Sequence, residues 1–260
     1  MSLEFPWLST REAGFLELWN STNGDENQKR LIEYLVHSFL YVDSDLSNEF
    51  CRLIADQITQ KWKLKPSNTF VSAACDNSKP DGSQLMVQKL KNHFPYGWYD
   101  YDFVNSLPVA VHKLHNNDNL VICDDFIGTG KTLKGKIQYV NKIIAEKGLN
   151  KIGIYIVAFA AMSFSRADLH YPLYACRYMP KGISETLTGN KLLIATRIMQ
   201  NMEGLLKSHI RGLYLPRFGY GRSESLYNFE GDNIPNNVFP IFWWKKYADD
   251  SLRMPMFRRI

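Results

Sequence analysis

Two adjacent acids followed by a glycine-rich stretch are the residues of this chain whose types and spacing best suit chemistry. They lie in the segment LVICDDFIGTGKTL, residues 120–133. The carboxylates of Asp124 and Asp125 accept hydrogen bonds, so they suit sugar hydroxyls or a hydrated cation. Gly128 and Gly130 allow the backbone to turn tightly and to aim its N–H groups at an anion.

A helix is predicted to begin directly after these glycines, which adds to the anion-binding character of the segment. A helix N-terminus carries a partial positive charge and unsatisfied N–H groups, and both favour a phosphate. The hydroxyls of Thr129 and Thr132 can donate hydrogen bonds to the same phosphate, and Lys131 lies between them. A phosphate on one side and a diol on the other describe a ribose 5-phosphate.

Two other interpretations of this segment stay open. The letters GTGKT resemble part of the phosphate-binding loop of nucleoside triphosphatases, but that loop has a glycine where this chain has Asp125. A carboxylate at this position would face the phosphates, which argues against such a loop. In the second interpretation the segment is an ordinary strand–turn–helix corner with solvated acids, and its paired acids and both threonines are coincidental.

Short strands alternating with helices are predicted from residue 66 onward, and these elements must position the segment. The expected strands are 69–74, 98–104, 108–114, 120–123 and 152–159, and the expected helices are about 85–94 and 133–148. Such alternation is typical of a parallel α/β sheet, in which ligands bind outside the carboxyl ends of the strands. Beyond residue 160 only a helix near 188–207 has a clear pattern.

Residues 1–65 are predicted to form an N-terminal helical extension, and residues 66–260 the main domain with a C-terminal packing segment. Leu31, Leu35 and Phe39 recur at helical spacing. Polar residues at 43–45 can cap a second helix. No internal repeat and no linker rich in Ser or Pro is visible, which favours one domain with this extension.

The composition indicates a folded protein that does not cross a membrane. The 260 residues are 45% hydrophobic and 22% charged, which excludes disordered, collagenous and disulfide-stapled classes. We expect a cytoplasmic protein, because no apolar run reaches about 18 residues and the N-terminus lacks a signal-peptide pattern. The four cysteines form no CxxC pair and are predicted to be reduced and structural. His112 and His115 have no third ligand nearby in the sequence, so no metal site is predicted there.

Charge is distributed unevenly along the chain. Residues 1–130 contain 11 Lys and Arg against 17 Asp and Glu, whereas residues 131–260 contain 20 against 9. A basic half can attract the phosphates of a nucleotide or a nucleic acid. The same residues can also simply solvate helix faces, and the sequence leaves both interpretations open.

Residues 120–132 resemble the diphosphate-sugar motif of phosphoribosyltransferases of type I fold. That motif has four apolar residues, two acids, two apolar residues, one further residue and then Thr-Gly-x-Thr. The resemblance implies a type I phosphoribosyltransferase-like parallel sheet flanked by helices. It also implies that the two acids hold the ribose hydroxyls of phosphoribosyl diphosphate, with Mg²⁺ bound mainly by the ligand's own oxygens. The residues implied to cradle the 5-phosphate are Gly128, Thr129, Gly130, Lys131 and Thr132.

The loop after the first strand, residues 72–83, takes the place of the family's pyrophosphate loop. This match is one of position rather than of sequence. The resemblance implies backbone amide contacts from Ser72, Ala73 and Ala74, and side-chain contacts from Lys79 or Ser83.

Two features depart from the family's pattern. In the 6-oxopurine branch an acid precedes the threonine of the motif and is the expected general base, whereas this chain has Gly128 there. The sequence therefore assigns no catalytic residue. The family also has a flexible hood loop between its second and third strands, and the predicted strands leave room only for a turn at 104–107.

The C-terminal region indicates a narrower relationship. Residues 218–227 and 232–243 resemble the ending of phosphoribosyltransferase-like proteins from bacterial conflict systems, including components of retron antiphage operons. With the central motif, the resemblance covers about residues 65–245. It implies a defence component that uses its ligand site as an effector or a sensor. The implied partners are a reverse transcriptase, its branched RNA–DNA product (msDNA) and a winged-helix companion.

Aromatic rings are concentrated in this ending. They suit packing onto the sheet or stacking on a base, and packing is the favoured interpretation; the rings are those of Phe239, Phe242, Trp243 and Trp244. Tyr220 and Arg222, which lie beside glycines, are the candidates for lining the ligand pocket from its far side.

Two further functions stay open beside the defence component. The central motif alone is compatible with a housekeeping nucleobase phosphoribosyltransferase. The basic second half alone is compatible with a non-enzymatic adaptor that binds a nucleoprotein.

Overall fold

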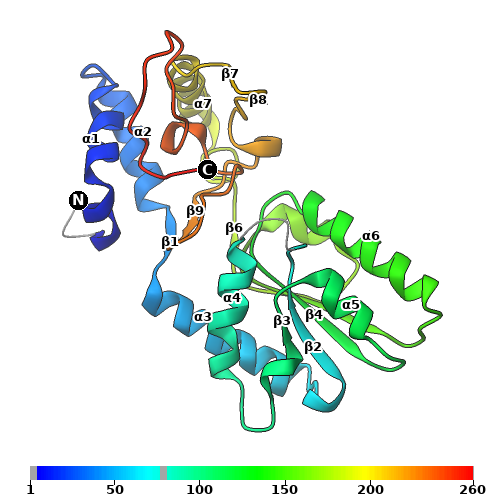
Figure 1. Ribbon diagram of the computed structural model, residues 1–260. Coiled ribbons are helices and arrows are strands. Elements are labelled where there is room, and N and C mark those ends of the chain that lie inside the picture. The colour runs from blue at the N-terminus through cyan, green and yellow to red at the C-terminus, as the bar shows by residue number, and fades with distance from the viewer. Residues whose placement is uncertain (1–4, 77–80, 260) are drawn as a thin grey trace. The chain divides into compact units, whose positions relative to one another are not determined.

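Apolar strands alternate with amphipathic helices between residues 44 and 179, and they form a parallel α/β sheet (Figure 1). The structure is a computed structural model that describes residues 5–76 and 81–259, without the side chains of residues 101, 167 and 168. The chain divides into two units. Ser44–Met179 contains the sheet, and Met1–Asp43 with Pro180–Ile260 forms the second unit.

The sheet of the Ser44–Met179 unit has five strands among the described residues, in the order β3-β2-β4-β5-β6. All pairs are parallel, and β4 pairs with β5 from Asn119–Gly153 to Ile127–Ala161. The strand bounds are β2 Thr69–Ala73, β3 Phe103–Val104, β4 Asn119–Ile127, β5 Gly153–Met162 and β6 Leu173–Met179. The central strands are buried on both faces, as expected of a parallel sheet covered by helices.

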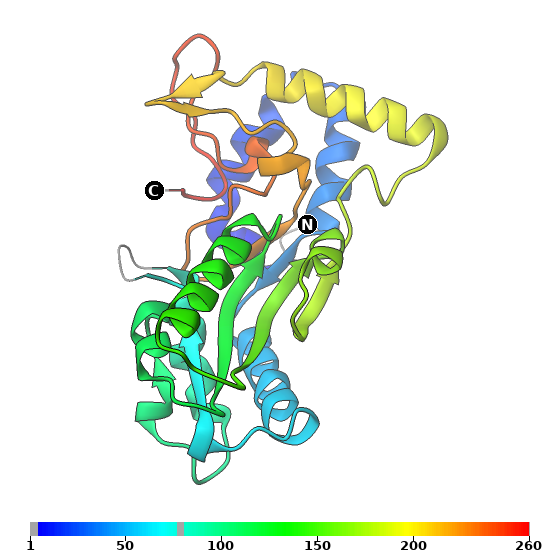
Figure 2. The same cartoon turned by 90° about the vertical axis from the view of Figure 1, so that its right-hand side faces the viewer.

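Helices cover both faces of this sheet. In Figure 1, α3 and α4 lie on one side, and α5 and α6 lie on the other. Phe50 of α3 packs on Phe159 of β5, with ring centroids 5.8 Å apart. On the other face Leu133 and Ile137 of α6 share a core with Ile122 of β4, and Figure 2 shows α6 running along the sheet. The helix bounds are α3 Ser44–Asp56, α4 Gly82–Leu90, α5 Leu107–Lys113 and α6 Lys131–Glu146.

Short helical turns complete the Ser44–Met179 unit. Their bounds are η2 Gln57–Lys61, η3 Pro66–Asn68, η4 Lys91–His93, η5 Asp100–Asp102 and η6 Ser163–Asp168. The first of these is a π-helical turn that continues α3.

The second unit joins the two ends of the chain. Its parallel strands β1 and β9 pair from Leu40–Tyr227 to Val42–Phe229, so residues nearly 190 positions apart lie side by side. Its helices are η1 Pro6–Arg11, α1 Glu12–Asn20, α2 Glu26–His37, α7 Gly189–Gly204, η7 Tyr220–Arg222 and η8 Pro240–Phe242. Its strands are β1 Leu40–Val42, β7 His209–Ile210, β8 Leu213–Tyr214 and β9 Tyr227–Phe229.

An aromatic cluster forms the core of this second unit. Trp7 stacks on Tyr41 with ring centroids 5.2 Å apart, and Phe39 stacks on Phe257 at 5.1 Å. The four C-terminal rings singled out in the sequence are at most 5% exposed, which confirms that they are core residues, but their core is that of the second unit rather than the five-stranded sheet. Trp243 also donates its indole N–H to the carbonyl oxygen of Val238 at 2.9 Å. Burying aromatic rings from both ends of the chain is what unites the two segments.

The structure confirms the predicted α/β class, the strands at 69–74, 120–123 and 152–159, and the helix near 188–207. The prediction of a strand at 108–114 is wrong, because this segment is helix α5. Ser106 occupies the N-cap in an extended conformation and Pro108 lies in the first turn, where proline is favoured in helices. The β-branched residues Val109 and Val111 favour a strand in the sequence, and the seven residues of α5 are too few to show helical periodicity.

Strand β6 was not predicted from the sequence. It lies at the edge of the sheet, and its Arg177 and Tyr178 are exposed while Ala175 and Met179 are buried. Edge strands tolerate polar residues, so the pattern lacks a continuous apolar run. The two units also divide after residues 43 and 179 rather than after residue 65, since α3 packs on the sheet. Within the described residues, no helix is both long and apolar enough to cross a membrane.

Candidate functional site

The sheet has a topological switch point between β2 and β4. The chain leaves β2 for β3 on one side, whereas β4 lies on the other side of β2. Loops that leave the carboxyl ends of two such strands diverge, and the crevice between them is where open α/β sheets bind ligands. Residues 74–81 follow β2 and residues 128–130 follow β4. The structure therefore brings the two predicted ligand-binding segments to the same edge of the sheet.

The two acids lie inside β4 rather than after it. Strand β4 continues to Ile127, and Asp124 is paired with Ala158 of β5. Asp124 is half-buried, and Asp125 is only 8% exposed. Strand pairing fixes their backbone, so both carboxylates are held on a rigid element at the end of the sheet. Such pre-organisation suits a binding site.

The glycine loop forms the N-terminus of α6. Gly130 is the N-cap residue with φ +72°, a left-handed conformation that glycine adopts without cost. Its carbonyl oxygen accepts the first helical hydrogen bond, from the Lys134 N–H at 2.9 Å. The Thr129 hydroxyl accepts a long hydrogen bond of 3.4 Å from the Lys131 N–H. The side chains of Lys131 and Thr132 are exposed at the helix N-terminus, where an anion is favoured.

Gly130→Ala is expected to destabilise the protein and to weaken phosphate binding. A Cβ on Gly130 would lie 3.8 Å from the Cβ of Ser165, an ordinary contact, so the left-handed φ is the main cost. That strain is worth about 1 kcal/mol. Gly135→Ala is the matched control, because this position in α6 has open space and a normal helical φ. Thermal unfolding should show a lower melting temperature for Gly130→Ala only. Equal melting temperatures of the two variants would contradict the left-handed conformation of Gly130.

The structure places residues of the second predicted loop in different roles. Ser72 and Ala73 lie within β2, and the Ser72 hydroxyl donates to the Ala73 carbonyl at 3.0 Å. The Ala74 N–H donates to the Cys123 carbonyl oxygen at 2.8 Å, so the sheet uses this amide. Ser83 is fully buried, and its hydroxyl donates to the Asp81 carboxylate at 2.5 Å. Lys79 lies outside the described residues.

Asp81 is a capping residue at the end of this loop that was not predicted from the sequence. Its carboxylate also accepts the Ser83 N–H at 2.8 Å, so it caps α4. The signal was the pattern Asp-Gly-Ser before an apolar helix, since aspartate is a preferred N-cap. This cap holds the C-terminal end of the loop. Ser165, whose buried hydroxyl donates to Met162 at 2.7 Å, was likewise missed beside Gly130.

The connection between β3 and β4 is longer than expected. With 108–114 in a helix, residues 105–118 connect the second and third strands of the sheet, and α5 lies within them. The prediction that only a turn separates these strands is therefore wrong. The Leu107 N–H donates to the Cys75 carbonyl oxygen at 2.9 Å, and the Cys75 thiol donates to the Asn105 carbonyl oxygen at 2.8 Å. These bonds attach the connection to the loop after β2.

Tyr220 and Arg222 belong to the second unit, so their role as pocket residues stays a prediction. They lie in a strained segment. Phe218, Arg222 and Glu224 all have positive φ values between 50° and 59°. The guanidinium of Arg222 stacks over the Phe218 ring, 4.6 Å from its centroid. Non-glycine residues in this conformation are held there by their surroundings.

Two buried glutamates hold this segment. Glu203 of α7 is fully buried, and its carboxylate accepts the Phe218 N–H at 2.9 and 3.2 Å. The Glu224 carboxylate accepts the N–H groups of Ile183 and Ser184 at 2.9 and 2.7 Å. Burial raises the pKa of Glu203 to about 7, although the Phe218 N–H lowers it.

Glu203→Gln is expected to flatten the dependence of stability on pH between about 4.5 and 7. The raised pKa means that the folded state retains a proton that the unfolded state releases above pH 4.5. The stabilisation of the folded state by this retained proton is fully present below pH 4.5 and is lost as the pH rises through 7. Glutamine keeps an oxygen to accept the Phe218 N–H and does not titrate. Denaturant unfolding at several pH values measures how the free energy of unfolding changes with pH. The same pH dependence in the variant and the unchanged protein would contradict the raised pKa of Glu203.

The cysteines behave as structural residues. All four are free thiols, and Cys176 is the one of them that is not fully buried. Burial raises the pKa of the Cys51 and Cys176 thiols to about 12, which suppresses the reactive thiolate. Among the described residues, no group of three or more His, Cys, Asp or Glu side chains is placed to hold a metal ion.

Comparison with known families identifies the chain. Residues 17–259 match the PRTase-CE family. The chain belongs to this family. The match includes both units, so the acids of β4, the glycine loop and the strained segment of the second unit are all parts of one PRTase-CE sequence. A comparison with curated proteins gives no match.

Two solved structures are similar to parts of this PRTase-CE chain. One is the HGPRT-ase from Leishmania tarentolae in complex with GMP, with 13% identity and a TM-score of 0.35 over 53% of this chain and 79% of that one. The other is the hypoxanthine-guanine phosphoribosyltransferase from Schistosoma mansoni in complex with IMP. It has 13% identity and a TM-score of 0.36 over 52% of this chain and 66% of that one.

Proposed function

We propose that this PRTase-CE chain binds phosphoribosyl diphosphate, or a related nucleotide, at the carboxyl ends of β2 and β4. One observation carries the proposal: two acids fixed in β4 and a glycine-capped helix N-terminus lie at the switch point of a parallel sheet. Asp124 and Asp125 accept the ribose hydroxyls, and the loop at 128–132 binds the 5-phosphate. The diphosphate lies toward the loop after β2.

A Mg²⁺ ion is proposed to accompany the diphosphate. The ion is proposed to be held mainly by the ligand's own oxygens, beside the carboxylates of Asp124 and Asp125, whose oxygens are of the type that Mg²⁺ prefers. When bound, the ion would neutralise the diphosphate and stabilise it as a leaving group. The chain's own part is to orient the sugar and to hold the 5-phosphate in place.

The chemistry proposed for this site is transfer or cleavage of the ligand, or its sensing. Gly128 occupies the position where 6-oxopurine enzymes of type I fold are expected to have an acid, so this chain offers no proton-transferring group there. A general base must lie within hydrogen-bond reach of the proton it removes. This loop alone is therefore not expected to support transfer to a nucleobase that must lose a proton.

We propose further that the protein serves in an antiphage defence system of the retron type. The support is the sequence of residues 218–243, which resembles that of such components. The proposed partners are a reverse transcriptase, its msDNA and a winged-helix companion. A reverse transcriptase gene beside this one supports the assignment, and a neighbourhood of purine salvage genes contradicts it.

Product analysis is the experiment that tests the chemistry. Purified protein is incubated with phosphoribosyl diphosphate, Mg²⁺ and each free nucleobase, and pyrophosphate release is measured. We expect no nucleobase to increase the release above the level with phosphoribosyl diphosphate alone. A base that does so, in a manner lost on changing the β4 acids, would instead establish a nucleobase phosphoribosyltransferase.

A further inference from the structure

A basic and aromatic stretch in the second unit contains the predicted pocket residues Tyr220 and Arg222, but its other residues are not used by the proposed ligand site. Residues 204–222 contain four Lys and Arg, one His and two Tyr, and contain no Asp or Glu. The stretch includes the β7–β8 hairpin and η7. Its side chains that face water are those of Leu205, Ser208, His209, Arg211, Leu213, Tyr214, Arg217, Tyr220 and Arg222. We call this set the hairpin surface.

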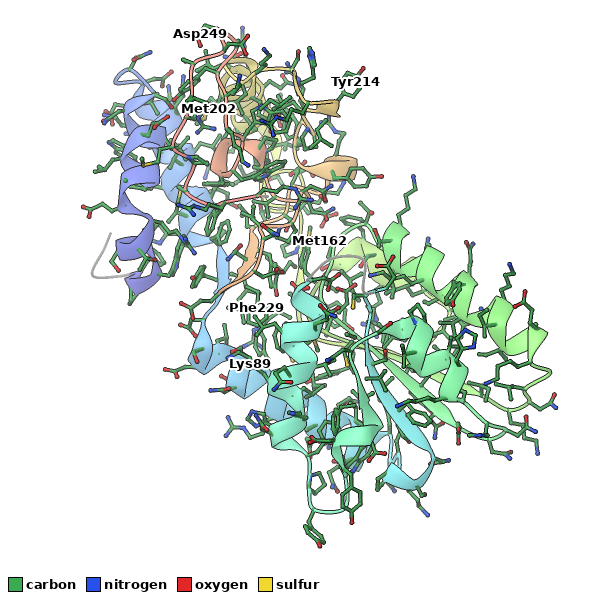
Figure 3. All side chains as sticks on the ribbon, in the orientation of Figure 1. Lys89, Met162, Met202, Tyr214, Phe229 and Asp249 are labelled. Carbon is green, nitrogen blue, oxygen red and sulfur yellow. The ribbon has the colours of Figure 1, made fainter. Side chains whose placement is uncertain are left out.

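The hairpin presents an aromatic side chain to solvent on a defined backbone. Its two turn residues, Arg211 and Gly212, have φ values of +49° and +79°, as in the tight turns that suit twisted strands. The Leu215 N–H donates to the Ser208 carbonyl oxygen at 2.8 Å and closes the base of the hairpin. Tyr214 is 83% exposed and projects outward in Figure 3. The turn thus holds the Tyr214 ring in solvent, where the packing of the protein does not need it.

A second exposed ring lies six residues further along the chain. Tyr220 is 41% exposed, and its N–H donates to the Asn236 carbonyl oxygen at 2.7 Å. Six residues of chain reach at most about 20 Å, so the Cα atoms of Tyr214 and Tyr220 are closer than this. Arg217 lies between them in sequence, and Arg222 follows. The segment that holds Tyr220 is fixed by buried Glu203 and is therefore pre-organised.

The acids nearest to this stretch compensate only part of its charge. Glu203 and Glu224 are buried and accept backbone N–H groups, and Glu203 also interacts electrostatically with Arg217 and Arg222. Asp250 forms ion pairs with Lys207 and Lys246. Arg211, Arg217 and Arg222 are exposed cations, each within three residues of one of the two rings in sequence.

We propose that the hairpin surface binds single-stranded nucleic acid. Exposed rings on which bases stack, interspersed with cations that contact phosphates, are what such binding requires. An anionic membrane would also attract the cations, but it favours a broad apolar face, and residues 204–222 expose only two large aliphatic side chains, Leu205 and Leu213. The proposal rests mainly on Tyr214, Arg211 and Arg217, which lie in the second unit and are not among the residues of the proposed ligand site.

Fluorescence anisotropy with labelled 12-nucleotide oligo-U and oligo-dT tests the proposal on the full chain. Binding is expected at 50 mM salt, and Tyr214→Ala with Tyr220→Ala should weaken it about tenfold or more. Arg211→Gln with Arg217→Gln should lower the slope of log affinity against log salt by about 1.4, two phosphate contacts of about 0.7 each. Lys61→Gln with Lys65→Gln is the charge-matched control, since both lysines are exposed in the other unit.

Three results would overturn the proposal. These are no binding at 100 µM protein, binding that neither double variant changes, and binding of anionic lipid vesicles without binding of either oligonucleotide. Circular dichroism verifies the folding of each variant. Titration with phosphoribosyl diphosphate should be unchanged in the single variant Tyr214→Ala, which leaves the predicted pocket residue Tyr220 in place, so failure of this proposal is distinguishable from failure of the proposed ligand site.

Discussion

Asp124→Asn with Asp125→Asn is expected to weaken the binding of phosphoribosyl diphosphate about 100-fold. Each carboxylate can accept charge-assisted hydrogen bonds from ribose hydroxyls, and such bonds contribute about 1.5–3 kcal/mol. Asparagine keeps the shape but removes the charge and replaces one acceptor with a donor. Because the β4 backbone is fixed by its pairing with β5, the variant should not relocate its side chains to compensate. Isothermal titration with Mg²⁺ present measures the change.

A charge-matched control separates the contact from the overall electrostatic effect. Asp45→Asn with Glu49→Gln removes two exposed acids from α3 in the same unit. This control should bind the ligand as the unchanged protein does. Equal affinity in both double variants would mean that the acids of β4 do not contact the ligand.

Gly219→Ala is expected to destabilise the second unit by about 3 kcal/mol or more. Gly219 has φ +76°, and a Cβ there would lie 1.9 Å from the backbone carbonyl oxygen of Asn237. That oxygen also accepts hydrogen bonds from Ser223 and Ser225, so it is not free to move. A clash with fixed backbone adds to the cost of the left-handed conformation. Thermal unfolding should show a loss of roughly 6–12 °C.

Gly189→Ala distinguishes the clash from the backbone strain. Gly189 has φ +55° in the same unit, and a Cβ there would meet open space. Its substitution should cost only about 1 kcal/mol. If Gly219→Ala is no more destabilising than Gly189→Ala, the close approach between residues 219 and 237 is not present in the protein.

Local patterns were sufficient to predict the elements that carry the site. A run of apolar residues before Asp124 predicted β4, and the glycines before Lys131 predicted the start of α6. These signals are local because hydrophobic burial and helix capping depend on neighbours in sequence. The exact end of β4 was not predicted, since acids rarely continue a buried strand, yet pairing with β5 extends it to Ile127.

Features that depend on distant contacts were not predicted. The union of residues 1–43 with 180–260 rests on the β1–β9 pair and on an aromatic core drawn from both ends. Neither β1 nor β9 exceeds three residues, so neither has a pattern of its own. Helix α5 was mistaken for a strand because seven residues are too few to show helical periodicity. The hydrogen bond that removes the Ala74 amide from the loop is likewise set by a partner 49 positions away.

Isothermal titration of the unchanged full chain with phosphoribosyl diphosphate and Mg²⁺ tests the central claim most directly. We expect saturable binding at one site per chain, with competition by ribose 5-phosphate, because the loop at 128–132 is proposed to bind the 5-phosphate. Absence of binding to folded protein at millimolar ligand would contradict it. So would binding that ribose 5-phosphate leaves unchanged.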